Sequence, residues 1–226
     1  MGSAVGTVLP LAVTIAIFPI PVVAAVLLVG SDRGLAKGAA FAGAWAAGLV
    51  AIGGVVLAIA GGTDAGEQGG EPTTLASALL LALGLALLVL AAKQWRERPS
   101  VGDEAPTPGW MRTIDELTVS RAAAVGFALS GLNPKNVLLV GAAAVEISVL
   151  GLPAGEQAAA LALFVLVASV GVVTPLVLTI TLGERAQALL EVLREWMTRH
   201  SAAIMTVLFL VIGAKLIGDA ISALSG

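Results

Sequence analysis

Residues 130–136 read SGLNPKN and interrupt an otherwise apolar stretch that extends from residue 122 to residue 145. Asn133 is a favourable N-cap residue, and Pro134 suits the first position of a helix, so a new helix is expected to begin at Pro134. A lysine at the centre of a bilayer costs about 2.5–3.5 kcal/mol on insertion scales, so Lys135 is expected to face a cavity or a partner. The stretch predicts a membrane helix that is broken inside the bilayer.

The composition of the whole chain supports a membrane protein. Of its 226 residues 58% are hydrophobic and 12% are charged, and the mean hydropathy is +1.00. A chain this apolar lacks the polar surface that a soluble domain needs. The net charge of -3 argues against a nucleic-acid partner, and the absence of cysteine excludes disulfides and cysteine-based metal or redox sites.

Apolar runs long enough to cross a bilayer occur six times, since a spanning helix needs about 20 mostly apolar residues. We expect a multi-pass protein of the cytoplasmic membrane. The predicted spans are residues 6–29, 39–61, 74–92, 122–150, 157–182 and 201–224.

The basic residues predict the orientation of these spans. Ten of the twelve lysines and arginines lie in segments 31–37, 93–121 and 183–200, whereas loops 62–73 and 151–156 contain none. By the positive-inside rule the basic segments are cytoplasmic. Both termini are therefore expected to be extracytoplasmic.

The proline- and glycine-containing segment 93–121 separates two similar halves. We interpret residues 1–92 as one three-helix repeat, residues 93–121 as a cytoplasmic linker with a short amphipathic segment, and residues 122–226 as a second repeat of opposite orientation. Both repeats open with a proline-broken helix, a pattern typical of inverted-repeat transporters. The predicted fold is an all-α integral membrane protein with six transmembrane helices, of which helices 1 and 4 are broken.

The two breaks are the candidate substrate site. Free N–H groups at the start of the helix at Pro134, its dipole and the charge of Lys135 together suit a carboxylate, phosphate or sulfate. Two alternatives remain: Lys135 forms a structural ion pair, or it extends to the interface. Of the two acids considered as partners, Glu146 is about 16 Å away along the same helix, which is too far for a pair, so Asp219 could be the partner only if the fold brings it close. The candidate substrate-binding residues are Pro19, Pro21, Asn133, Pro134, Lys135 and Asn136.

Three further charged residues are candidates for coupling or gating. Lys215 and Asp219 are four residues apart and face the same side of their helix, as a neutralised pair or as a coupling pair. Glu146 is expected near the outer end of the fourth span, where a role in proton coupling is possible.

Two other patterns concern packing and the interface. Segment 183–200 is predicted to be an amphipathic helix on the cytoplasmic face. Ribbons of small residues predict close helix contacts and permit a homodimer. These ribbons are Ala39, Gly43 and Ala47 on the second span, and Ala214, Gly218 and Ser222 on the sixth.

The sequence does not indicate an enzyme. Asp219 has no second intramembrane aspartate to pair with, and His200, the only histidine, is expected at the cytoplasmic edge. Ligands for a catalytic metal are lacking for the same reason. We therefore expect no catalytic residues, no metal and no cofactor.

Two motifs resemble the GAP family of actinobacterial membrane proteins, also called sulfolipid- or glycopeptidolipid-addressing proteins, within the lysine-exporter superfamily. The resemblance implies a six-helix exporter-like fold and a role in moving cell-envelope glycolipids toward the surface, beside a larger lipid transporter. By motif it extends to the six candidate substrate-binding residues. The motifs are Leu9-Pro10-Leu11 with Pro19-Ile20-Pro21, and Ile114-Asp115-Glu116-Leu117-Thr118 with Arg121 and residues 131–136.

Together these observations predict an exporter of an anionic small or amphiphilic solute, preferably a cell-envelope glycolipid or its precursor. The expected partners are that anionic substrate, membrane lipids, a larger lipid transporter and a second copy of the chain. One alternative is an amino-acid or ion exporter of the lysine-exporter type. Another is an accessory scaffold that does not itself transport, which a tightly packed Lys135 with an internal partner would favour.

Overall fold

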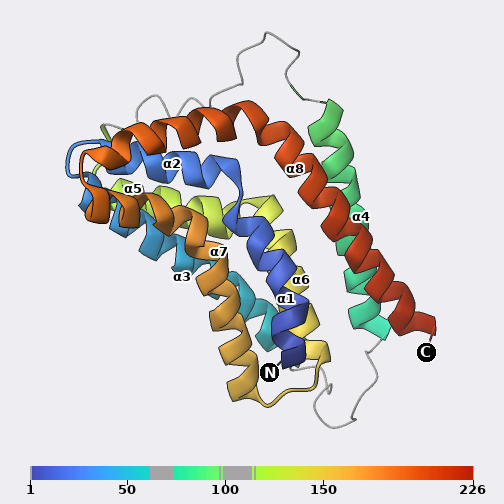
Figure 1. The fold of residues 1–226 in the computed structure, drawn as a ribbon. Helices are drawn as coiled ribbons and strands as arrows, with labels where there is room; N and C mark the ends of the chain where they lie inside the picture. The colour runs from blue at the N-terminus through green and yellow to red at the C-terminus, as the bar shows by residue number, and fades with distance from the viewer. Residues whose placement is uncertain (1, 62–73, 97, 99–113, 115, 226) are drawn as a thin grey trace.

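The computed structural model describes the chain except residues 1, 62–73, 97, 99–113, 115 and 226, and the described part contains helices and no strand (Figure 1). Most of the predicted linker, with Trp110, lies outside the described residues, as does loop 62–73. The helices are α1 (Gly2–Ala16), α2 (Pro19–Gly30), α3 (Gly34–Gly61), α4 (Thr74–Arg96), α5 (Val119–Phe127), the π-helical turn η2 (Ala128–Leu132), α6 (Pro134–Val149), α7 (Ala154–Leu182) and α8 (Arg185–Ser225).

The helices account for the predicted spans. α3, α4, α7 and α8 are each long and apolar enough to cross a membrane. α1 and α2 form a bent pair with an angle of 54°, and the helix from Val119 to Leu132 forms a second bent pair with α6, with an angle of 59°. With each bent pair taken as one span, the described residues contain six spans. The all-α membrane class and the two broken helices are confirmed.

The same local chemistry makes both breaks. Phe18 and Asn133 have extended backbones, with ψ angles of 120° and 117°, and each precedes a proline that begins the next helix. The proline ring disfavours helical geometry at the residue before it and also removes a backbone donor. A proline is, however, well suited to the first turn of a helix. Each break therefore ends one helix and starts another within two or three residues.

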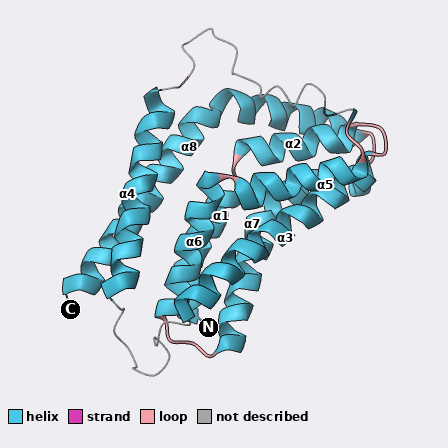
Figure 2. Ribbon diagram, turned by 180° about the vertical axis from the view of Figure 1, so that it is seen from behind, coloured by secondary structure: helices cyan, strands magenta, loops and turns pink. Residues whose placement is uncertain are grey.

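The two halves pack on each other reciprocally. α3, from the first half, packs against α5 and α6, and α7, from the second half, packs against α1 and α2. α4 packs against α8, and α4 and the second part of α8 form a pair beside the central helices (Figures 1 and 2). The two termini lie at the same end of the molecule (Figure 1). We refer to α4 and the second part of α8, residues 201–225, as the α4–α8 arm.

Glycines allow the closest of these contacts. A Cβ atom on Gly171 of α7 would lie 1.8 Å from the carbonyl oxygen of Ala16, at the end of α1. Gly84 of α4 and Gly213 of α8 face each other, since a Cβ on either would lie 2.9 or 3.0 Å from the carbonyl oxygen of the other. The backbones of the two halves meet at these points, as small residues permit in membrane bundles.

The predicted small-residue ribbons do not make these contacts. Ala39, Gly43 and Ala47 are exposed on α3, and Ala214 and Gly218 are exposed on α8. A Cβ on Gly43 or Gly218 would meet no atom within 4 Å. The residues of each ribbon do share one face of their helix, but this face is exposed and does not pack against another helix of the chain.

α8 differs from its prediction, because segment 183–200 and the sixth span form one helix of 41 residues. Neither glycine nor proline occurs between residues 185 and 212, so nothing in the sequence ends the helix where its composition changes. Its first part extends along α2, and its second part turns down beside α4 (Figure 1). Ala186, Leu190 and Met197 are buried, as the amphipathic pattern indicated, whereas Leu189 is exposed.

Candidate functional site

The second break is stabilised by its own side chains. The Asn133 Oδ1 atom accepts a hydrogen bond from the backbone N–H of Lys135 at 3.1 Å, and the Asn133 carbonyl accepts from Val137 at 3.0 Å. Asn133 is therefore the N-cap of α6, as predicted. Of the helix-terminal N–H groups that the anion site was expected to use, that of Lys135 is bound by the cap, and Pro134 has none. The side chain of Lys135 is thus the main group left to bind an anion here.

Lys135 joins the start of α6 to the α4–α8 arm. Its Nζ atom donates a hydrogen bond to Oε1 of Gln94, in the last turn of α4, at 2.9 Å. The same nitrogen lies 5.6 Å from the centre of the Phe209 ring on α8, within the range of a cation–π contact. The predicted alternative partners, Glu146 and Asp219, instead contact Lys215. Lys135 is partly buried, and it does not form either of the ion pairs considered from the sequence.

Asn136 connects the two sides of the second break by a hydrogen bond in the protein interior. It is fully buried, and its Nδ2 atom donates to the carbonyl oxygen of Leu129, in η2, at 2.8 Å. The π-helical turn leaves carbonyl groups without their usual helical partners, and Asn136 satisfies one of them. Its Oδ1 atom has no hydrogen-bond partner among the described residues. Asn136 is therefore placed to fix the bend between η2 and α6.

The first break reaches the same helix of the arm. Pro19 and Pro21 are buried at the start of α2, and Phe18 precedes them. The Phe18 ring packs edge-to-face on Phe209, with ring centres 5.9 Å apart. Phe209 is fully buried and contacts residues of both breaks. The candidate residues of the two halves are thus brought together through a residue that the sequence did not single out.

Glu146, Lys215 and Asp219 form a second polar cluster. Lys215 Nζ lies 2.7 Å from Oε1 of Glu146 and 2.8 Å from Oδ2 of Asp219. The side chains are 4%, 27% and 46% exposed for Glu146, Lys215 and Asp219, so the cluster leads from the interior to the surface. Oε2 of Glu146 has no hydrogen-bond partner among the described residues. The predicted proximity of Lys215 and Asp219 is present, and Glu146 joins them from α6.

The two polar clusters lie at opposite ends of α6. Lys135 and Glu146 are eleven residues apart, which corresponds to about 16 Å along a helix. At one end Lys135 links α6 to Gln94 and Phe209, and at the other end Glu146 links α6 to Lys215. The arm is therefore tied to α6 by polar contacts at two levels.

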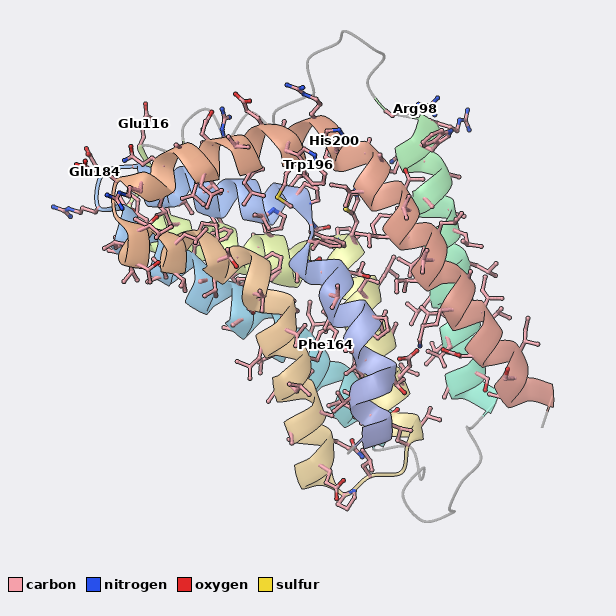
Figure 3. The ribbon with its side chains drawn as sticks, viewed as in Figure 1. Arg98, Glu116, Phe164, Glu184, Trp196 and His200 are labelled. Atoms are coloured by element: carbon pink, nitrogen blue, oxygen red, sulfur yellow. The ribbon has the colours of Figure 1, made fainter. Side chains whose placement is uncertain are left out.

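Aromatic and charged side chains gather on one side of the molecule. Trp196 and His200 lie close together on α8, and Glu116, Glu184 and Arg98 lie in the same upper part of the molecule (Figure 3). The Trp196 and His200 rings are stacked with centres 4.9 Å apart, and the Arg98 guanidinium lies 3.7 Å from the centre of the Trp95 ring. Tryptophans of this kind are typical of a membrane–water interface.

Gln94 and Phe209 are the residues of the site that the sequence did not reveal. Gln94 stands between Lys93 and Trp95, and a polar residue in this position is common at a membrane interface, so nothing in the sequence marked it as part of a site. Phe209 lies in an apolar run with no distinguishing neighbour. Their roles depend on contacts with residues distant in the chain, for which one sequence carries no signal.

These features define a multi-pass helical membrane protein with two broken helices, both of which contact the ring of Phe209. Comparison with known families is more specific. The family model described as Sap, sulfolipid-1-addressing protein, matches residues 8–222, so the chain belongs to the sulfolipid-1-addressing protein family. The family resemblance predicted from the sequence motifs is thereby confirmed. No curated protein and no solved structure matches the chain.

Proposed function

We propose that this protein exports an anionic amphiphile, a cell-envelope glycolipid or its precursor, across the cytoplasmic membrane. The observation that carries the proposal is the position of Lys135. This partly buried lysine lies at the second break and is connected through Phe209 to the first break. A lysine inside a membrane protein is costly and is usually kept for a function.

The arrangement of the contacts suits alternating access. Broken helices near the bilayer centre are where transporters with repeated halves bind their substrates. Here α6 is linked to the α4–α8 arm at both ends, through Lys135 and through Glu146. Opening one link at a time would expose the space between α6 and the arm first to one side of the membrane and then to the other.

The surroundings of Lys135 favour an amphiphile over a small solute. Leu132 is 72% exposed, and Pro134 and Val137 are also exposed, so the break borders the surface that faces lipid. A lipid can keep its acyl chains in the bilayer while its anionic headgroup reaches the ammonium group. The family is named for a sulfolipid, which is an amphiphile of this chemical class.

An accessory role is the second candidate, and one observation favours it. The hydrogen bond between Lys135 and Gln94 gives the lysine a partner inside the chain. A lysine held in this way can simply join α6 to α4. The protein would then be a scaffold for a larger lipid exporter and would not bind the lipid at Lys135.

Thermal unfolding in detergent distinguishes these functions, because a ligand that binds only the folded state raises its stability. The variant Lys135→Met removes the charge and keeps most of the side chain. Lys93→Gln is the matched control, since it removes an exposed cation from the last turn of α4. The ligands are a sulfated glycolipid, the same glycolipid without sulfate, phosphatidylglycerol and free lysine.

We expect the sulfated glycolipid to raise the Tm of the wild type and of Lys93→Gln, and to leave that of Lys135→Met unchanged. A ligand present at 100 times its Kd stabilises the folded state by about 2.7 kcal/mol, which is easily measured as a Tm shift. Stabilisation by free lysine alone would indicate a small-solute exporter. If no ligand raises the Tm of any variant and Lys135→Met is less stable than the wild type, the scaffold is the correct function.

A further inference from the structure

In the cluster formed by Glu146, Lys215 and Asp219, the buried carboxylate of Glu146 has a hydrogen-bond partner for only one of its two oxygens. Its side chain is 4% exposed, and one carboxylate oxygen contacts Lys215 at 2.7 Å. The other oxygen, Oε2, is buried and has no hydrogen-bond partner among the described residues. A buried carboxylate is normally paired and hydrogen-bonded through both oxygens, because the charged group is costly to bury.

The charges of the cluster do not balance. Lys215 contributes one positive charge and contacts two carboxylates, those of Glu146 and Asp219. The helices packed against α6 place their other described charged residues at their ends. These residues are Lys37 in the first turn of α3, Lys93 and Arg96 in the last turn of α4, and Glu156 in the first turn of α7. The groups in contact at the cluster itself are Glu146, Lys215 and Asp219.

We propose that Glu146 is a proton-binding site, and that a proton bound there releases the α4–α8 arm from the end of α6. The proton enters from the side of the membrane on which the termini lie, past Asp219, which is 46% exposed. It binds a carboxylate oxygen of Glu146, and the carboxylate becomes a neutral carboxylic acid. Lys215 remains a charged ammonium group and keeps its contact with Asp219, four residues along the same helix.

A proton fits this cluster better than a metal cation. A metal would have to displace the Lys215 ammonium group, which already lies between the two carboxylates. In the part of the chain that the structure describes, no group of three or more histidine, aspartate or glutamate side chains comes together to hold a metal. A proton needs only one free oxygen, and Oε2 of Glu146 provides it.

The inference rests on the proposed function, because it names the ion that would drive the export. The neutral form of Glu146 loses its strong contact with Lys215, so the link at this end of α6 opens while the Lys135 link can remain closed. Loss of the proton restores the ion pair. The two ends of α6 would then open alternately.

Infrared difference spectroscopy tests proton binding directly. The protein is reconstituted into phosphatidylcholine vesicles, and spectra at acid and alkaline pH are subtracted. A carboxylic acid in apolar surroundings gives a carbonyl band that solvated acids do not share. We expect this band in the wild type and in Glu184→Gln, which removes an exposed carboxylate outside the cluster, and we expect it to be absent in Glu146→Gln. A band of equal size in Glu146→Gln, or its absence from the wild type, would overturn the proposal.

A second measurement needs no variant, in case Glu146→Gln does not fold. Heavy-carbon labelling of the glutamate carboxyl groups in the wild-type protein lowers the frequency of the band if a glutamate carries the proton. An unshifted band would assign the proton to an aspartate and would contradict the role of Glu146.

Spin labels test the movement of the arm, and the absence of native cysteines allows them to be placed freely. Suitable exposed positions are Ile221→Cys on α8 and Ala158→Cys near the start of α7. In otherwise wild-type protein and with Glu184→Gln, acid pH should shift the distance between the labels to larger values. With Glu146→Gln the larger distance should be present at every pH. A distance that is independent of pH in the wild type would refute the release of the arm.

The outcomes separate this inference from the proposed function. Lipid stabilisation that depends on Lys135, without a Glu146 band, would leave the export function in place and overturn proton coupling. A Glu146 band with a moving arm, without lipid stabilisation, would overturn the export function and retain the proton site.

Discussion

The ammonium nitrogen of Lys135 lies 5.6 Å from the centre of the Phe209 ring. The same ring receives the edge-to-face contact of Phe18, so one buried phenylalanine of α8 contacts residues of both breaks. The two breaks are therefore connected through a third element, and a change at Phe209 should affect both.

Replacing Phe209 by alanine should destabilise the protein strongly. Phe→Ala substitutions in packed cores cost about 3–5 kcal/mol, and here two specific ring contacts are also lost. Thermal unfolding in detergent measures the effect. Phe127→Ala is the control, since Phe127 is partly exposed and its truncation should lower the Tm much less. Equal losses in the two variants would show that Phe209 has no special place in the packing.

Replacing Gly171 by alanine should force α7 away from α1. The added Cβ would lie 1.8 Å from the Ala16 carbonyl oxygen, which is far inside contact distance. Overpacking of this kind typically costs about 1–3 kcal/mol. Gly43→Ala, at an open position of α3, should leave the Tm unchanged. A Tm for Gly171→Ala that matches the wild type would show that α7 and α1 accommodate an added methyl group at this contact.

Replacing Asn133 by alanine should remove the cap of α6. The loss of an N-cap side chain typically costs about 1 kcal/mol, and serine should restore most of it. Hydrogen exchange at the Lys135 amide is the sharper measurement, because this amide donates to Asn133 Oδ1. We expect faster exchange in Asn133→Ala and nearly normal exchange in Asn133→Ser. Unchanged exchange in both variants would contradict the capping interaction.

The orientation in the membrane can be checked with single cysteines. Asp32→Cys and Glu184→Cys lie in the turns that the basic residues assign to the cytoplasm, and Ala154→Cys lies at the exposed first residue of α7, at the opposite end of that helix from Glu184. An impermeant thiol reagent applied to intact cells should label Ala154→Cys alone, and the other two should react only after the membrane is opened. The reverse pattern would place the termini in the cytoplasm.

The parts of the fold that depend on local chemistry could be predicted from the sequence. Pro19 and Pro134 mark both breaks because a proline acts on its immediate neighbours. The proximity of Lys215 and Asp219 follows from helical spacing alone. The cap formed by Asn133 has the same origin.

The parts that depend on tertiary packing could not be predicted. Gln94 and Lys135 are 41 residues apart in the chain, and Glu146 and Lys215 are 69 apart. Nothing in the local sequence selects these pairs over others. The small-residue ribbons failed for a related reason, because spacing identifies a helical face without indicating what the face meets. The continuity of α8 was missed because a change in composition was interpreted as an end of the helix.

Because translation proceeds from the N-terminus, Glu146 is synthesised before its ion-pair partner Lys215. The lysine is translated 69 residues after the glutamate, and at about 5–20 residues per second this takes roughly 3–14 s. During that interval the newly inserted α6 holds an acid whose lysine does not yet exist. A nascent chain that stops before α8 keeps this acid unpaired in the membrane. α8 is thus the helix that completes the surroundings of Glu146, and a chain without it leaves a buried acid without its basic partner.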